Sequence, residues 1–518
     1  MFRNSFPFSF LFFVPILFLI SPVCPASDFA VYRMQQFDLQ GVSHGCRNAI
    51  INVEARPITA SVYTRKCVVS KLKELAFSKY KEILQQNANG LLVLLPRTFD
   101  QISREDEEHL IELEHQLLSD ETQLPVYFAY EDDKLLNIYE DLKSFGNADS
   151  AESALEAIVR SSNLYGFQFI INGPQSKALN DFEIVNLQGK LIGHGLEEQL
   201  PTVLVVAYYD AIGVAPSLAR GSNSNGSGVV AILELIRLFS KLYSHSKSHP
   251  KMNLQFLLTG AGKLNYQGTK RWLEDHSEGL FVCMFLSQFK AVICIDSIGS
   301  GPGLFAHVSK PPKEGSFADL IIKVCFAARL FEMIHKKINL AERHLSWEHE
   351  RFSINKLYAF TVSSFKSPRD MRLRSITDTM DKLDVEGLSR NIRIIADGLA
   401  GQIFNLSNPG SDIFVDHLSV NKELVSSWLE HISSVPRSAQ LLKKDSPLIS
   451  TFEGWFSKHL RSVKRHTFKA DKREPEFVFY TGAEYSLGVY SVKPAVFDLI
   501  LAVGIALYLG LLYLISQV

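Results

Sequence analysis

Short apolar runs recur along the middle of the chain and predict strands that are buried on both faces of a sheet. They are residues 203–207, 254–258, 292–295 and 358–362. Between the first two runs, residues 229–243 place apolar side chains at helical spacing, and residues 388–403 repeat that pattern after the last run. Strands that alternate with helices favour a parallel α/β sheet covered on both faces, with any site at the carboxyl ends of the strands.

The pattern changes on both sides of this region and indicates further parts. Residues 27–150 form an N-terminal region with two short buried strands, at 90–96 and 124–129. An acidic stretch between them contains His109 and His115, whose spacing of six puts them on different helical faces, so a solvated helix is expected there. The α/β domain then occupies residues 151–407, and a mixed region with a basic stretch at 464–473 follows at 408–494.

Both ends of the chain are apolar, in two different ways. Residues 1–26 combine a basic start, a short apolar core and small residues at the end, which is typical of a cleaved signal peptide. Residues 495–515 match the length of about 20 residues that crosses a hydrocarbon core, and they leave a tail of 516–518. Together they predict a single-pass type I membrane protein with most of the chain in the lumen, although the basic residues before the span oppose the positive-inside rule.

Composition limits the classes of function. The chain has 518 residues, 46% of them hydrophobic and 21% charged, so it is globular and long enough for two or three domains. A net charge of −1 without a broad basic stripe argues against nucleic-acid binding. Asn225 and Asn405 lie in sequons and are candidate glycosylation sites in a luminal chain. Of the cysteines, Cys46 and Cys67 could form a bridge, and Cys294 lies in an apolar run as a buried thiol.

The residues that follow the predicted strands carry the candidate chemistry. After the first strand come Tyr208 and Asp210, and then a glycine-rich loop with Ser224 that opens a helix. This order resembles the M28 zinc aminopeptidases, in which His-x-Asp and Asp-Asn-x-x-Gly supply the first ligands. The resemblance implies an M28 peptidase-like mixed sheet with helices on both faces. Tyr208 stands where the ligand histidine would be, Asp210 where its orienting carboxylate would be, and Ser224 where the bridging aspartate would be.

The remaining landmarks of that family are altered in the same way. Gly262 and Lys263 align with the glutamate pair that supplies the general base and a ligand, and Arg374 aligns with the final histidine. Among the positions that align with the zinc ligands, only Asp296 still has a side chain that can bind the metal. Two zinc ions about 3.5–4 Å apart need several converging donors and a base. The sequence therefore predicts a degenerate site without metal, cofactor or catalytic residues.

We expect the lost metal charge to be compensated. One hypothesis is that Lys263 and Arg374 occupy the metal positions and pair with Asp296 and Asp210, because buried unpaired charges are costly. The alternative is that these loops lie at the surface without any pairing. No His-Glu-x-x-His motif occurs in the sequence.

Longer stretches, which composition does not explain, are similar to the nicastrin/nicalin group. They are residues 209–228, 265–275, 307–315, 347–352, 469–480 and 493–510. The resemblance implies an endoplasmic-reticulum membrane protein without peptidase activity, acting as a scaffold subunit. It also implies three kinds of partner: a Nodal modulator-like luminal protein, a small multi-span membrane protein and the Sec translocon, with a role in inserting multi-pass membrane proteins.

Two other functions remain open from the sequence. One is an active zinc aminopeptidase with rearranged ligands. The other is a nicastrin-like receptor that binds peptide ends in the vacant cleft.

Overall fold

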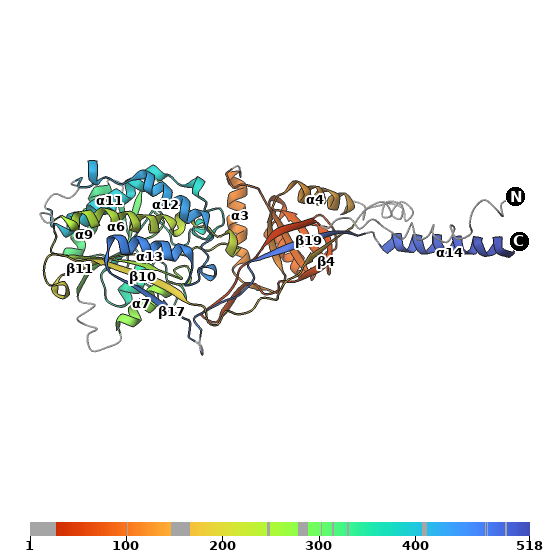
Figure 1. Ribbon diagram of the computed structural model, residues 1–518, viewed down its shortest axis with the longest axis horizontal. Helices are drawn as coiled ribbons and strands as arrows, with labels where there is room; N and C mark the ends of the chain where they lie inside the picture. Colours follow the sequence, from red (N-terminus) through yellow and green to blue (C-terminus); the bar gives the residue numbers. More distant parts are fainter. Residues whose placement is uncertain are drawn as a thin grey trace.

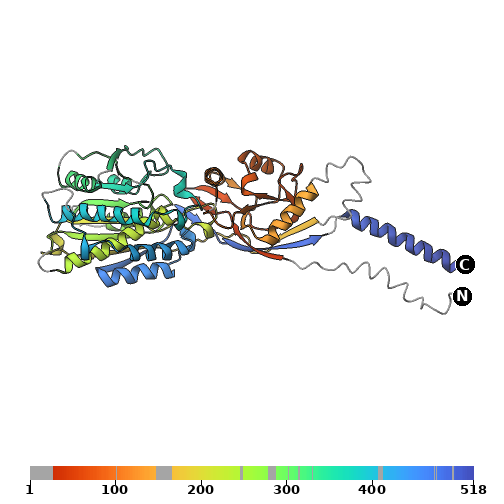
Figure 2. The ribbon, with the colours of Figure 1, turned by 90° about the horizontal axis from the view of Figure 1, so that it is seen from above.

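The central strand of the larger unit is β11 (Thr202–Tyr208), and it is buried along its whole length. The computed structural model describes residues 27–100, 102–146, 166–245, 249–277, 288–301, 303–312, 315–328, 331–406, 412–471, 473, 475–492 and 495–517. These residues form three parts in a row, an α/β unit, a barrel and a terminal helix (Figures 1 and 2). The predicted signal peptide, 1–26, lies outside the described residues.

The α/β unit contains an eight-stranded mixed sheet in the order β15-β14-β16-β13-β11-β12-β10-β17. Its four central strands are parallel: β11, β12 (Asn253–Thr259), β13 (Phe289–Ile295) and β16 (Ala359–Ser363). The other strands are β10 (Ile184–Leu191), β14 (Leu304–Val308), β15 (Phe331–His335) and β17 (Arg461–Phe468). β10 and β17 pair antiparallel, as do β14 and β16. The predicted mixed α/β sheet is confirmed.

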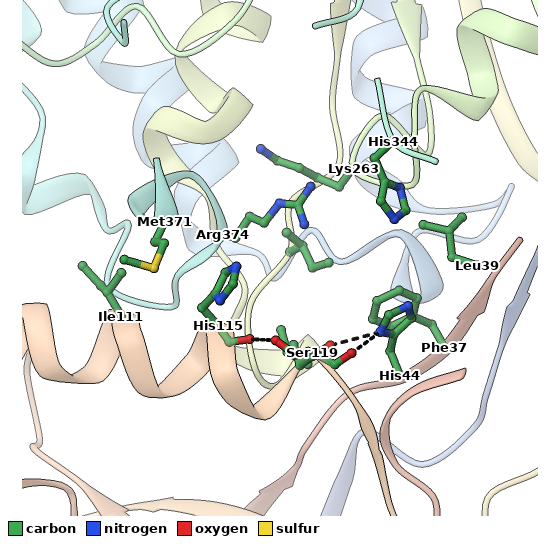
Figure 3. Close-up of a pocket in the computed structure, with 12 residues that line it drawn as sticks. Phe37, Leu39, His44, Ile111, His115, Ser119, Lys263, His344, Met371 and Arg374 are labelled. Carbon is green, nitrogen blue, oxygen red and sulfur yellow. Dashed lines mark hydrogen bonds between the residues drawn. The ribbon is translucent and has the colours of Figure 1, made fainter. Parts of the chain in front are cut away.

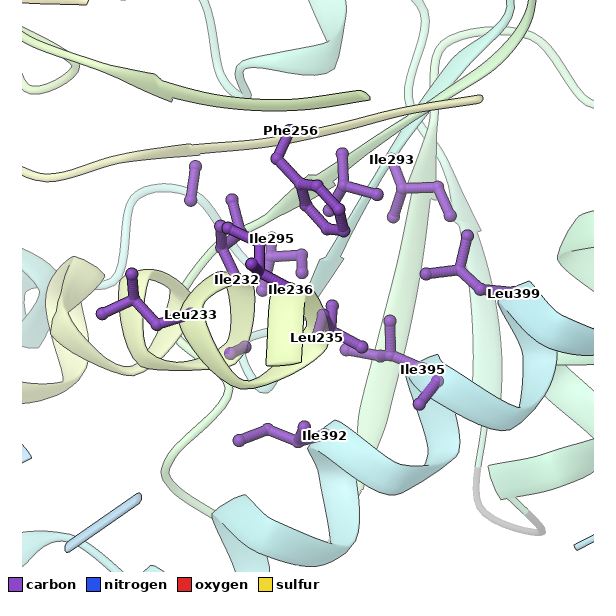
Figure 4. Packing of buried hydrophobic residues seen from close by; sticks show 14 of the residues in the cluster. Ile232, Leu233, Leu235, Ile236, Phe256, Ile293, Ile295, Ile392, Ile395 and Leu399 are labelled. Atoms are coloured by element: carbon purple, nitrogen blue, oxygen red, sulfur yellow. The ribbon is translucent and has the colours of Figure 1, made fainter. Parts of the chain in front are cut away.

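Side chains of β11 alternate between two apolar clusters, one on each face of the sheet. Val203, Val205 and Ala207 pack with helix α6 (Gly228–Ser244), whose residues are buried nearly all round. Leu204 and Val206 pack against the opposite face. This two-sided burial explains why the strand reads as a continuous apolar run. Figure 4 shows Ile232, Leu235 and Ile236 of α6 facing strand residues and the helix that carries Ile392 and Ile395.

Helices cover both faces of this sheet, as expected. On the face of α6 lie α9 (Ser316–Ala328), α11 (Val385–Ile403), α12 (Lys422–Ser434) and α13 (Pro447–His459) (Figure 1). On the other face lie α7 (Gln267–Ser277) and α10 (His349–Ile354).

The second part is a closed barrel in the order β1-β19-β9-β4-β5-β6-β8. Strand β1 pairs with both β19 and β8, and this closes the ring. The strands are β1 (Ser27–Arg33), β4 (Ile51–Pro57), β5 (Cys67–Lys71), β6 (Gly90–Leu95), β8 (Val126–Tyr130), β9 (Gly166–Ile171) and β19 (Glu484–Val492). Helices α2 (Phe77–Gln85), α3 (Arg104–Leu117) and α4 (Asp133–Gly146) accompany it.

A small sheet adjoins the barrel, in the order β18-β2-β3-β7. Its strands are β2 (Gln36–Leu39), β3 (Val42–Cys46), β7 (Glu121–Thr122) and β18 (Phe477–Phe479). Phe37 and Leu39 of β2 share an apolar cluster with Phe182, Ile212 and Leu264 of the α/β unit. The N-terminal part and the α/β unit are therefore packed together.

The boundaries that we expected from composition do not divide the folded chain. Strand β9 belongs to the barrel although it lies within 151–407. The region 408–494 is not a separate part, because β17 completes the sheet of the α/β unit while β19 closes the barrel. These pairings join residues far apart in sequence, so local composition does not reveal them.

Two smaller expectations about the N-terminal part are also corrected. The acidic stretch is a helix, α3, but Glu114 on it is 1% exposed instead of solvated. Cys46 and Cys67 are buried free thiols and do not form a bridge; the Cys46 thiol donates to the carbonyl oxygen of Leu124 at 3.2 Å. Cys294 is a buried free thiol, as predicted.

The third part is helix α14 (Ala495–Gln517), which projects from the barrel end of the molecule (Figure 1). Its described side chains are those of residues 502–511, 513 and 514. Within the part of the chain that the structure describes, no helix is both long and apolar enough to cross a membrane.

Candidate functional site: a cleft at the ends of the central strands

The residues predicted from the sequence converge at the carboxyl ends of β11, β12 and β13. Tyr208 is the last residue of β11, and Asp296 directly follows β13. Tyr208, Gly262, Lys263, Asp296 and Arg374 all line one cavity of ≈ 400 Å³. Parallel strands end at the same edge of a sheet, which explains why residues so far apart in sequence meet there.

Tyr208 and Asp296 form the floor of the cleft. The phenol of Tyr208 donates a hydrogen bond of 2.9 Å to Oδ1 of Asp296, and the hydroxyl of Ser297 donates to the same oxygen at 2.6 Å. Burial, and then the charge of Asp296, raise the pKa of Tyr208 well above its usual range. The phenol therefore stays protonated and acts as a donor instead of a metal ligand.

Lys263 places an ammonium group where the family has a metal ligand. Its Nζ donates to Oγ of Ser224 at 2.5 Å and lies 5.1 Å from the centre of the Tyr208 ring. The Ser224 hydroxyl in turn donates a hydrogen bond of 2.8 Å to the carbonyl oxygen of Leu373. Burial lowers the pKa of Lys263 to about 8, and the nearby carboxylate of Asp296 partly opposes that shift.

Direct ion pairs of Lys263 and Arg374 with Asp296 and Asp210, the first hypothesis from the sequence, are not present. The carboxylate of Asp210 instead accepts the backbone N–H groups of Gly262 at 2.6 Å and Lys263 at 3.0 Å. Among the described residues, no ion pair joins Lys263 or Arg374 to either aspartate. Backbone amides and hydroxyls satisfy the two carboxylates, so Lys263 acts on them only through the longer-range effect of its charge.

The glycine-rich loop before α6 is buried and held by Asp378. That carboxylate accepts the backbone N–H groups of Asn223 at 2.9 Å and Ser224 at 2.8 Å. Asn225 is 0% exposed, and its Nδ2 donates to the carbonyl oxygen of Ile295 at 2.8 Å. The folded loop therefore leaves no room for a glycan on Asn225, whereas Asn405 is exposed.

Arg437 stabilises this loop, and no motif in the sequence marks it as a residue of the site. It lies between α12 and α13, and its buried guanidinium donates to the carbonyl oxygens of Tyr209, Arg220 and Gly221. Burial lowers the pKa of Arg437 to about 10. These contacts span more than 200 residues of sequence, which explains why no local pattern marks them.

The N-terminal part also contributes to the cleft, although no pattern in the sequence indicates this. His115 of α3 lines the main cavity, and it also lines a neighbouring one of ≈ 150 Å³ together with Lys263, His344 and Arg374 (Figure 3). Next to it, Oε1 of the Glu114 carboxyl group accepts the backbone N–H groups of Val214 and Ile376. A buried carboxyl group thus connects α3 to the loops of the α/β unit.

The residues present do not fit a pair of zinc ions. Gly262 has no side chain to act as a base, Lys263 offers an ammonium group, and the Tyr208 phenol is engaged as a donor. Asp296 is the one carboxylate left at a former ligand position. Within the described ranges, no group of three or more His, Cys, Asp or Glu side chains could hold a metal ion.

The architecture and the position of the cleft define the class: an α/β unit of the M28 peptidase type, joined to a further barrel. The profile of Peptidase family M28 matches residues 186–398. A crystal structure of the gamma-secretase component nicastrin superimposes with a TM-score of 0.63 and 10% identity, covering 89% of this chain and 99% of that one. At this identity the likeness concerns the fold alone.

Relatives in sequence identify the family. The human protein named BOS complex subunit NCLN is 44% identical over 530 residues, covering 99% of this chain and 94% of the relative. The Caenorhabditis elegans protein named nicalin is 29% identical over 520 residues, covering 95% of this chain and 90% of the relative. This chain belongs to the nicalin family.

Proposed function

We propose that this chain is a non-catalytic subunit of a membrane-protein complex in the endoplasmic reticulum. The observation that carries the proposal is a sequence identity of 43–44%, over 99–100% of this chain, with proteins named as subunits of the BOS complex. As in the resemblance drawn from the sequence, its partners would be a Nodal modulator-like luminal protein, a small multi-span membrane protein and the Sec translocon. Its role would be to assist the insertion of multi-pass membrane proteins.

The side chains in the cleft support a protein that acts by binding partners and not by catalysis. A metallopeptidase needs an activated water and a base, and here Lys263 brings a positive charge to the position of a metal ligand while Gly262 replaces the base. The alternative of an active zinc aminopeptidase has no comparable support from the donor atoms.

We further propose that residues 495–515 anchor the chain in the membrane, with most of the chain in the lumen after cleavage of 1–26. The support is a helix of 23 residues, α14, whose described side chains are mostly apolar and exposed, among them Val503, Leu507 and Leu514. In the sequence, residues 495–515 match the length of about 20 residues that crosses a hydrocarbon core, and Asp498 is their one charged side chain.

Affinity purification of the tagged full chain from gently solubilised membranes tests the proposal. We expect a luminal protein and a multi-span protein to be recovered in fixed ratio, and equally so with the cleft variant Arg374→Gln. A variant that lacks residues 495–517 should lose the multi-span partner. Recovery of the chain alone would overturn the proposal, and stoichiometric zinc with chelator-sensitive peptide hydrolysis would support the aminopeptidase instead.

A further inference from the structure

The cleft has a surplus of positive charge. Four cationic side chains line it, those of Lys263, Arg343, Arg369 and Arg374, together with the imidazoles of His115 and His344. The acidic lining consists of Asp296, Glu342 and Asp370.

Each of the acidic groups already has a partner. Arg369 pairs with Glu342 at 3.4 Å, and Arg372, just outside the lining, pairs with Asp370 at 2.6 Å. Oδ1 of Asp296 accepts the hydroxyls of Tyr208 and Ser297, as described above. No carboxylate within ion-pair distance is therefore left for Lys263 or Arg374 in the described part of the chain.

Lys263 and Arg374 also act on each other. The charge of Arg374 contributes to lowering the pKa of Lys263, so two like charges share the cavity. Arg374 is exposed and can be reached by a ligand, while Lys263 lies deeper. An anion between them would relieve their repulsion and accept charge-assisted hydrogen bonds from both.

The rest of the lining favours an anion that carries an organic body. Tyr266, Trp347, Met371 and Leu373 contribute aromatic and aliphatic surface to the same cavity. Its volume of ≈ 400 Å³ is within the range of ligand pockets, roughly 300–1,000 Å³, and is far more than a simple inorganic anion fills.

We propose that this cleft binds the C-terminal carboxylate of an extended polypeptide, held by Arg374 and Lys263, with the last side chain against Trp347 and Met371. Guanidinium binds a carboxylate through two parallel hydrogen bonds, and the aromatic lining suits one or two residues of chain. The charge preference is thus the reverse of that of an aminopeptidase, which must accept a cationic amino end. The inference goes beyond complex assembly, which requires no ligand in this cleft.

Calorimetric titration of the purified full chain with matched short peptides tests the proposal. The first peptide has a blocked amino end and a free carboxylate, the second is the same peptide with an amidated end, and the third has a free amino end with the amide. We expect only the first to bind well, with at least about tenfold weaker binding of the amidated forms.

Variants locate the site. Arg374→Gln should weaken binding of the first peptide by about tenfold or more, and Arg374→Lys should weaken it less because the charge remains. Arg461→Gln, the same change on an exposed arginine of β17 outside the lining, should leave binding unchanged. Equal binding of the acid and amide forms, preference for the free amine, or failure of the acid form to bind would overturn the proposal. So would inorganic phosphate that binds as tightly as the peptide.

Discussion

The ring of Tyr208 occupies the space that any side chain at residue 262 would need. A Cβ added to Gly262 would overlap Cβ and Cγ of Tyr208, so the aromatic residue and the glycine depend on each other. The position of the lost histidine and that of the lost base are thus coupled by packing, because a side chain at residue 262 would need residue 208 to move.

Gly262→Ala should therefore destabilise the protein by about 1–3 kcal/mol, the usual cost of overpacking a buried site. In a Tyr208→Gly background, which removes both Cβ and Cγ, the same change should cost much less, and a double-mutant cycle in thermal unfolding measures that coupling. Gly454→Ala is the control, because nothing lies within 4 Å of the added carbon on helix α13 and alanine favours helix. A coupling near zero would contradict the mutual dependence.

Zinc binding should not return when only the first two ligands are restored. In the double variant Tyr208→His, Ser224→Asp, the ammonium group of Lys263 still lies in the site and repels a dication. Adding Lys263→Glu and Arg374→His should permit zinc to bind. Elemental analysis of the purified variants, after exposure to zinc and desalting, gives the stoichiometry. Zinc in the double variant would show that Lys263 does not block the site.

The contribution of Glu114 to stability should fall as pH rises from about 5 to 7. Burial raises the pKa of this carboxyl from 4.5 to about 7 in the folded protein. The folded state therefore holds a proton that the unfolded chain releases, and this stabilisation is complete below pH 4.5 and lost as pH rises through 7. The shift corresponds to about 3 kcal/mol.

Glu114→Gln removes this titration, so the thermal midpoint of the variant should rise relative to that of the parent protein between pH 5 and 7. Glu112→Gln, on the exposed side of the same helix, is the matched control and should leave the profile as it is. If Glu114→Gln leaves the slope unchanged, the carboxyl is not protonated in the folded state at pH 5 to 7.

Glycosylation should distinguish the two sequons. We expect a glycan on Asn405, which is exposed, and none on Asn225, whose amide is buried and bonded to Ile295. Glycopeptide mass spectrometry of the chain from mammalian cells measures both sites, and Ser407→Ala should abolish the modification. A glycan on Asn225 in folded protein would contradict the buried loop, and the absence of any glycan would count against luminal placement of the chain.

Much of the larger unit could be predicted from the sequence alone. The apolar runs at 203–207 and 254–258 lie within β11 (Thr202–Tyr208) and β12 (Asn253–Thr259), and the helical pattern at 229–243 lies within α6. Burial on both faces produces continuous apolar runs, and this signal is local. That Tyr208, Gly262 and Asp296 meet at one edge of the sheet could be predicted as well, because they lie at or just after the ends of such strands.

Only the tertiary structure decided how the parts of the chain join and which partners the charged side chains in the cleft have. β19 closes the barrel and β17 completes the larger sheet, although both come from one stretch near the end of the chain. Arg437 braces a loop more than 200 residues away, and Lys263 bonds to Ser224 instead of an aspartate. Strand pairing over long separations and the direction of a loop side chain depend on what packs around them, and hydrophobic periodicity does not record either.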